Sequence, residues 1–92
     1  MEYNTLEGRK EIYKLAYEYY VKNEEFTGGI CEVIASIINK NISGYVFATG
    51  VLFRFPELAE KKPLVTHSLV FWFPTNIKSR IKRLEILKEL SA

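Results

Sequence analysis

An almost continuous apolar stretch over residues 30–40 limits how this 92-residue chain can fold. Before Lys40 at its end, only Glu32, Ser36 and Asn39 interrupt the stretch, and their spacing follows the α-helical repeat. A helix that is apolar around most of its circumference has to be covered by other elements, because apolar surface is unfavourable in water. We therefore expect residues 30–40 to form the central helix of the protein, with Thr27 as its N-cap.

A second helix is expected over residues 5–22, where apolar side chains recur with the helical period. Asn4, followed three residues later by Glu7, resembles a capping box at its start. The expected apolar face comprises Ile12, Leu15, Ala16 and Tyr19, with Tyr13 and Tyr20 at its margins.

A third helix is expected at the C-terminal end of the chain, starting near Thr75 after Pro74. Its main apolar stripe consists of Ile77, Ile81, Leu84 and Leu87. Ile86 and Leu90 lie on another side of the same helix, and a second apolar face needs a second surface to cover it. Two interpretations are open: these two side chains pack on the end of the same fold, or they form a surface for self-association.

The segment between these helices is ambiguous. Residues 45–53 are rich in strand-favouring side chains and fit a buried helix equally well, whereas residues 66–72 favour a strand. A short helix is expected over residues 55–62, with Pro56 at its first position. The resulting fold class is mostly α: one small domain of about four helices over residues 1–92, with room for a short strand or hairpin within 45–73.

Composition argues against several classes of function. The 13 basic and 11 acidic side chains give a net charge of only +2, which is too balanced for a dedicated nucleic-acid binder. One cysteine excludes an internal disulfide, and one cysteine with one histidine argues against a zinc site. The chain has no apolar run of membrane-spanning length and no signal-peptide pattern. We expect a cytoplasmic protein with no membrane contact, no bound metal and no cofactor.

Nucleophilic catalysis would require Cys31 as the nucleophile and His67 as its base. Cys31 lies in the first turn of the central helix, where the helix dipole favours a thiolate. Its neighbours are apolar, however, and free cysteine is among the most frequently buried residue types. We therefore expect a structural role for Cys31 and no enzymatic activity.

Charges in the C-terminal helix are arranged against its own dipole: the basic side chains come early and the acidic ones late. An anion bound at the start of the helix would explain this order, because free backbone amides and cations would converge on it. The alternative is that the cations are solvated surface groups. The predicted ligand-binding residues are Asn76, Lys78, Arg80 and Arg83, with Trp72 as an aromatic platform.

Tyrosines are concentrated in the first helix. Tyr13, Tyr17 and Tyr20 lie on successive turns, and tyrosine is enriched at protein interfaces. These side chains are expected either to pack at the rim of the core or to form an interaction surface. A chain of this length buries only a marginal core, so we expect a homo-oligomer that uses these tyrosines or Ile86 and Leu90.

The sequence also resembles a group of known proteins at three motifs and two later positions. These are Gly29-Ile30-Cys31, Phe55-Pro56-Glu57 and Phe71-Trp72-Phe73-Pro74, followed by Arg83 and Leu87. They are similar to motifs in a group of short uncharacterised proteins of bacteriophages and prophages. The resemblance implies a small helical accessory protein without catalysis, present in the host cytoplasm. By analogy of setting, such a protein binds a host protein or sequesters a nucleotide signal.

Non-enzymatic binding is therefore the expected function, with three hypotheses. The first is sequestration of an anionic small ligand, such as a nucleotide, at the start of the basic helix. The second is inhibition of a host protein through the tyrosine-rich face or the C-terminal helix. The third, which the balanced charge disfavours, is nucleic-acid binding through the basic helix.

Overall fold

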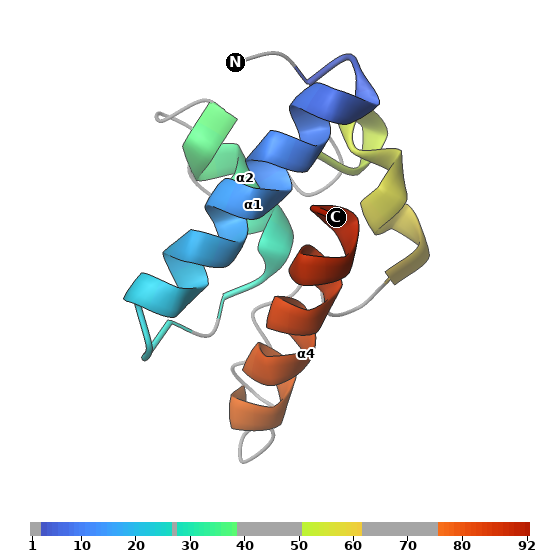
Figure 1. Cartoon of the computed structure of the whole chain (residues 1–92). Helices are drawn as coiled ribbons and strands as arrows, with labels where there is room; N and C mark the ends of the chain where they lie inside the picture. The colour runs from blue at the N-terminus through green and yellow to red at the C-terminus, as the bar shows by residue number, and fades with distance from the viewer. Residues whose placement is uncertain (1–2, 27, 39–50, 62–75) are drawn as a thin grey trace.

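The computed structural model describes residues 3–26, 28–38, 51–61 and 76–92. These residues form α1 (Leu6–Lys22), α2 (Ile30–Ile38), the 3-10 helix η1 (Pro56–Lys61) and α4 (Asn76–Leu90), and they contain no strand. A further helical turn covers residues 51–54. α1 packs against both α2 and α4 (Figure 1). The predicted mostly α fold of about four helices is confirmed.

α1 begins where its N-cap residue satisfies a free amide. Thr5 has extended backbone angles, and its hydroxyl accepts a hydrogen bond of 3.1 Å from the Gly8 N–H. The predicted cap at Asn4 is therefore wrong by one residue. Glu7 in the first turn and Lys22 in the last turn both complement the helix dipole.

The buried face of α1 is rotated from the predicted one. Ile12, Tyr13, Ala16 and Tyr20 are the buried residues of the helix. Leu15 and Tyr19, which we expected in the core, remain 37% and 39% exposed. The reason is that α2 and α4 cover different flanks of α1, so the buried stripe lies between these two contacts.

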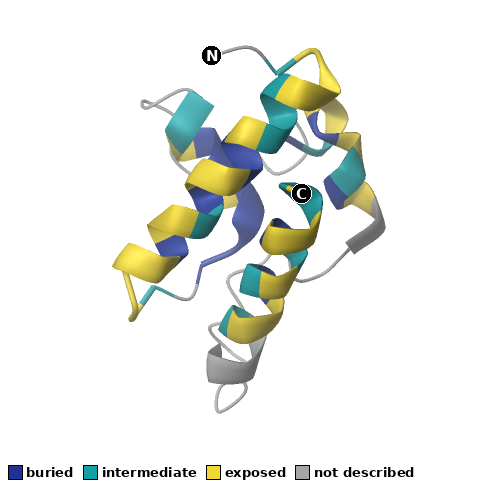
Figure 2. Ribbon diagram, in the orientation of Figure 1, coloured by how far each residue is buried: buried dark blue, intermediate teal, exposed yellow. Residues whose placement is uncertain are grey.

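α2 is the central helix that the apolar stretch predicts. Five of its nine residues are buried, and Glu32 and Ser36 lie on its exposed side (Figure 2). The predicted N-cap Thr27 and the predicted last residues 39–40 lie outside the described residues. The buried residues are Ile30, Cys31, Val33, Ile34 and Ala35.

Residues 51–61 attach to the core through Val51, Phe55 and Leu58, all of which are buried. Of the two alternatives for residues 45–53, the part described, 51–53, is helical. Pro56 starts a helix as predicted, but the helix is of the 3-10 type, which proteins use for short segments. Residues 45–50 and the strand expected over 66–72 lie outside the described residues.

α4 begins at Asn76, one residue after the expected start, and the buried residues among its described side chains are Arg83 and Leu87. Ile86 and Leu90 are half-buried and pack against the core, as the first of the two interpretations expects, and a self-association surface at these residues stays a prediction. Ile81, expected in the main apolar stripe, is 50% exposed instead. The stripe is displaced because α4 turns the side containing Arg83 and Leu87 toward the core.

Candidate binding surface

Arg80 connects the start of α4 to the end of α1. Its Nη2 group donates a hydrogen bond to the backbone carbonyl of Tyr20, in the last turn of α1. The last four carbonyls of an α-helix have no partner within the helix, and the dipole makes this end negative. The guanidinium therefore satisfies a free carbonyl and places a positive charge at the negative end of α1.

Arg83 lies one turn further along α4 and is fully buried, with 0% of its surface exposed. Burial lowers the pKa of the Arg83 guanidinium, while the Tyr20 phenol and the Glu32 carboxylate act in the opposite direction. The Tyr20 hydroxyl donates a hydrogen bond of 2.5 Å to the Gly28 carbonyl. Gly28 is itself tightly enclosed, since a Cβ there would collide with the Phe26 ring.

Arg80 and Arg83, two of the predicted ligand-binding residues, thus interact with other residues of the same chain. α1 and α4 run in roughly opposite directions, so the cationic start of α4 meets the negative end of α1 (Figure 1). This contact supplies an internal reason for charges that oppose the dipole of α4. The side chains of Asn76 and Lys78, and all of Trp72, lie outside what the structure describes, so an anion site at these residues stays a prediction.

A polar cluster joins α1 to η1. Arg9 donates from Nε to Oε1 of Glu57 and from Nη2 to Oε2, both at 2.8 Å, and the Tyr13 hydroxyl donates to Oε1 at 2.5 Å. The hydrogen bond from Arg9 is the main cause that lowers the pKa of Glu57. Burial, together with the neighbouring carboxylate, raises the pKa of Tyr13 far above its usual value.

Sequence reasoning missed this cluster because its members are 44 and 48 residues apart. The only local signal was Pro56-Glu57 at the start of a short helix, which suggests an acid favoured by the helix dipole. The cluster fixes residues 51–61 against α1. The side chains of Arg9, Tyr13 and Glu57 are therefore used in contacts with one another that stabilise the fold.

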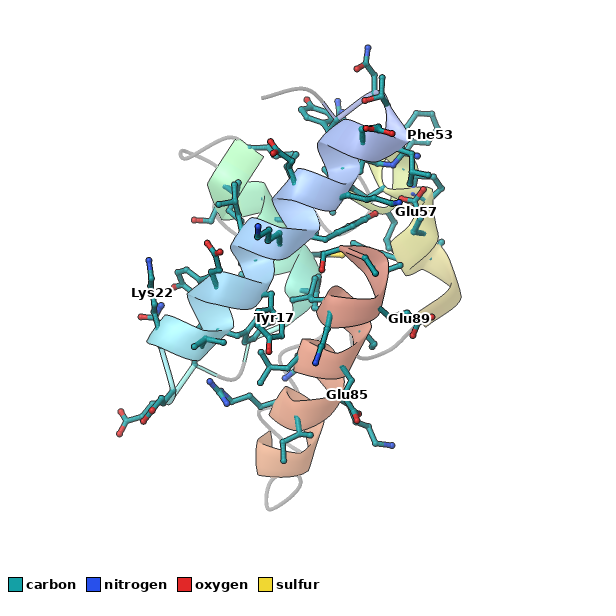
Figure 3. The ribbon with its side chains drawn as sticks, viewed as in Figure 1. Tyr17, Lys22, Phe53, Glu57, Glu85 and Glu89 are labelled. Atoms are coloured by element: carbon teal, nitrogen blue, oxygen red, sulfur yellow. The ribbon has the colours of Figure 1, made fainter. Side chains whose placement is uncertain are left out.

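The predicted tyrosine surface is divided by the fold. Tyr13 and Tyr20 are fully buried, so the prediction that they lie at the margin of the core is wrong. Their hydroxyls are used by Glu57 and by the Gly28 carbonyl. Tyr17 is half-buried, packs against the core and lies between α1 and α4 (Figure 3). Of the three, only Tyr17 has surface left for a partner.

Exposed apolar side chains accompany Tyr17 at this junction of α1 and α4. Val21 is 49% exposed and Ile81 is 50% exposed. Val21 and Ile81 directly follow Tyr20 and Arg80, the two residues joined by the hydrogen bond between the helices. The bond therefore places both residues at the same end of the α1–α4 packing. We call Tyr17, Val21 and Ile81 the α1–α4 surface; sequence analysis missed Val21.

Phe53 is a separate exposed apolar residue. It is 88% exposed on the helical turn that precedes η1, near the start of α1 in Figure 3. Its neighbours Val51 and Phe55 point into the core. Phe53 is therefore held on a fixed turn, away from the α1–α4 surface.

Catalysis and metal binding would depend on Cys31, His67 and clusters of histidine, cysteine or acidic side chains. Cys31 is buried, and His67 lies outside the described residues, so the pairing of the two is not tested by the structure. Within residues 3–26, 28–38, 51–61 and 76–92, no group of three or more histidine, cysteine or acidic side chains could hold a metal ion. None of the described helices is both long enough and apolar enough to cross a bilayer.

Comparison with known proteins adds no assignment. No family model fits the sequence, and neither a curated protein nor a solved structure matches it.

Proposed function

We propose that this protein is a non-enzymatic binding protein that engages another protein through the α1–α4 surface. The observation that carries the proposal is the half-exposed pair Val21 and Ile81, which the Arg80–Tyr20 contact holds at one end of the two packed helices. In the phage setting that the sequence resemblance implies, the partner would be a host protein.

Binding through the α1–α4 surface would cost little conformational entropy. Both exposed residues are β-branched and lie on helices, so their side chains have few rotamers to lose on binding. The ring of Tyr17 adds a large, rigid apolar group one turn before Val21 on α1, and tyrosine is enriched among residues that dominate binding energy. A partner that covers this surface would gain apolar burial without first rearranging α1 or α4.

Protein binding is preferred to anion sequestration because Arg80 and Arg83 already serve the fold. Arg80 satisfies the end of α1, and Arg83 is buried near Tyr20 and Glu32. An external anion at the start of α4 would have to bind mainly through Asn76 and Lys78. A nucleotide that raises the melting temperature, with the increase lost in Lys78→Ala, would favour the anion function instead.

The test begins with cross-linking in cells to identify a partner, followed by calorimetric titration of the two purified proteins. Ile81→Ser is expected to weaken binding about tenfold or more, because residues at the centre of an interface typically contribute this much. Phe53→Ser is the control, since it removes an even more exposed apolar group, 88% against 50% for Ile81, from a different surface. Unchanged affinity in Ile81→Ser, or a larger loss in Phe53→Ser, would reject the α1–α4 surface.

A further inference from the structure

A second exposed surface lies on α1 and does not depend on the function proposed above. Leu15 and Tyr19 are one helical turn apart, and both are exposed. The Tyr19 ring is held in place by edge contacts with Phe26 and Tyr20, at centroid distances of 5.3 and 6.5 Å. This leaves a small apolar pair in a fixed orientation on the solvent side of α1.

Charged residues flank this apolar pair in a specific order. Glu11 precedes Leu15 by one turn, and Lys22 follows Tyr19 by about one turn. Lys14 and Glu18 lie on the same flank of the pair and are also exposed. In the described part of the chain, none of these four side chains forms an ion pair, in contrast to Arg9 and Glu57.

The order of charges is complementary to itself when the direction of the helix is reversed. Two copies of α1 packed antiparallel about a twofold axis, in the register that sets Glu11 opposite Lys22 of the partner subunit, would place Leu15 within one residue of the level of Tyr19 of the partner subunit. The same register places Lys14 near Glu18 of the partner subunit. A parallel pairing about a twofold axis would instead place each residue level with its own copy, so Glu11 would be too far along the axis from Lys22 of the partner subunit to pair with it.

We propose that the exposed face of α1 is the contact surface of an antiparallel homodimer, with Leu15 and Tyr19 at its centre and the pair formed by Glu11 and Lys22 at both ends. The occupant of this surface is a second copy of the chain because the charges that flank Leu15 and Tyr19 complement their own reversed order. Twofold symmetry forms every such ion pair twice.

The test is sedimentation equilibrium of the full-length protein over a range of concentrations and salt. The wild type is expected to dimerise, and Glu11→Lys or Lys22→Glu alone should weaken the dimer about tenfold, since each converts two attractive pairs into two repulsive ones. The double variant Glu11→Lys/Lys22→Glu should restore it. An equimolar mixture of the two single variants should form a heterodimer, because both of its ion pairs are attractive.

Glu85→Lys is the matched control: it makes the same charge change at an exposed position on α4 (Figure 3) and should leave dimerisation unchanged. Circular dichroism confirms that each variant keeps its helices. A wild type that stays monomeric throughout overturns the proposal. So does a dimer that tolerates both single charge reversals, or a double variant that remains as weak as either single one.

Discussion

Replacing Glu57 by alanine would remove the acceptor that links Arg9 and Tyr13 to residues 51–61. The side chains of Arg9 and Glu57 are 14% and 25% exposed, so the ion pair falls between a surface pair and a buried one. Breaking a surface pair costs roughly 0.2–1 kcal/mol and breaking a buried pair roughly 3–5 kcal/mol, which suggests about 2 kcal/mol here. The Tyr13 hydroxyl also loses its acceptor inside the protein, which costs about 1 kcal/mol more.

The expected loss in the free energy of unfolding is therefore about 3 kcal/mol, or a fall in melting temperature of about 12–24 °C for a domain of this size. Urea unfolding, monitored by circular dichroism, measures the loss in the free energy of unfolding. Tyr13→Phe should cost about 1 kcal/mol, and a double-mutant cycle with Glu57→Ala should show coupling of similar size. A loss below about 1 kcal/mol for Glu57→Ala, or additive effects of the two changes, would refute the reasoning.

The same cluster predicts a dependence on acid. Hydrogen bonding to Arg9 lowers the pKa of Glu57 in the folded protein below its unfolded value. The unfolded chain therefore binds this proton first as pH falls, and the stability contributed by the carboxylate is lost as pH falls from about 4.5 through the folded pKa. Glu57→Gln should flatten this part of the stability profile. Identical acid profiles for the wild type and the variant would contradict the assignment.

Three further predictions concern single contacts. Arg80→Ala should lower the free energy of unfolding by about 1 kcal/mol in a urea titration without any ligand. Lys82 is an exposed neighbour, and Lys82→Ala should change the free energy of unfolding by less than about 0.5 kcal/mol in the same titration. Thr5→Ala should cost about 1 kcal/mol, and equal losses in Thr5→Ala and Asn4→Ala would show that the cap is misplaced. Burial raises the pKa of Tyr20, so the folded protein keeps the phenol proton at pH values where the unfolded chain loses it. The free energy of unfolding should therefore fall above about pH 10. Tyr20→Phe should reduce that fall in unfolding experiments across this pH range.

The positions of the helices could be predicted from the sequence because they depend on neighbouring residues. α1 was expected over residues 5–22 and spans Leu6–Lys22, and α4 begins one residue after the expected start. Periodic apolar spacing, the helix-starting proline Pro56 and a short polar cap are all local signals. The burial of Ile30 to Ala35 followed for the same reason, since almost every side of α2 is apolar.

The buried face of α1 could not be predicted in this way. Apolar and aromatic residues occupy most of its circumference, so periodicity alone supports more than one buried stripe. Packing against α2 on one flank and α4 on another places Tyr13 and Tyr20 inside and leaves Leu15 and Tyr19 outside. The choice depends on where two other helices lie, and no local pattern contains that information.

The predicted anion site at the start of α4 shows most clearly what the sequence determines and what the packing of the helices decides. The sequence shows that cations gather at the start of α4 and that their order opposes its dipole. An external anion and the end of another helix would satisfy such cations equally well. Arg80 meets the carbonyl of Tyr20, 60 residues away along the chain, and Arg83 is buried close to the same residue. The contact with Tyr20 follows from how α1 and α4 pack in space, because the charge pattern along one helix does not specify which helix packs beside it.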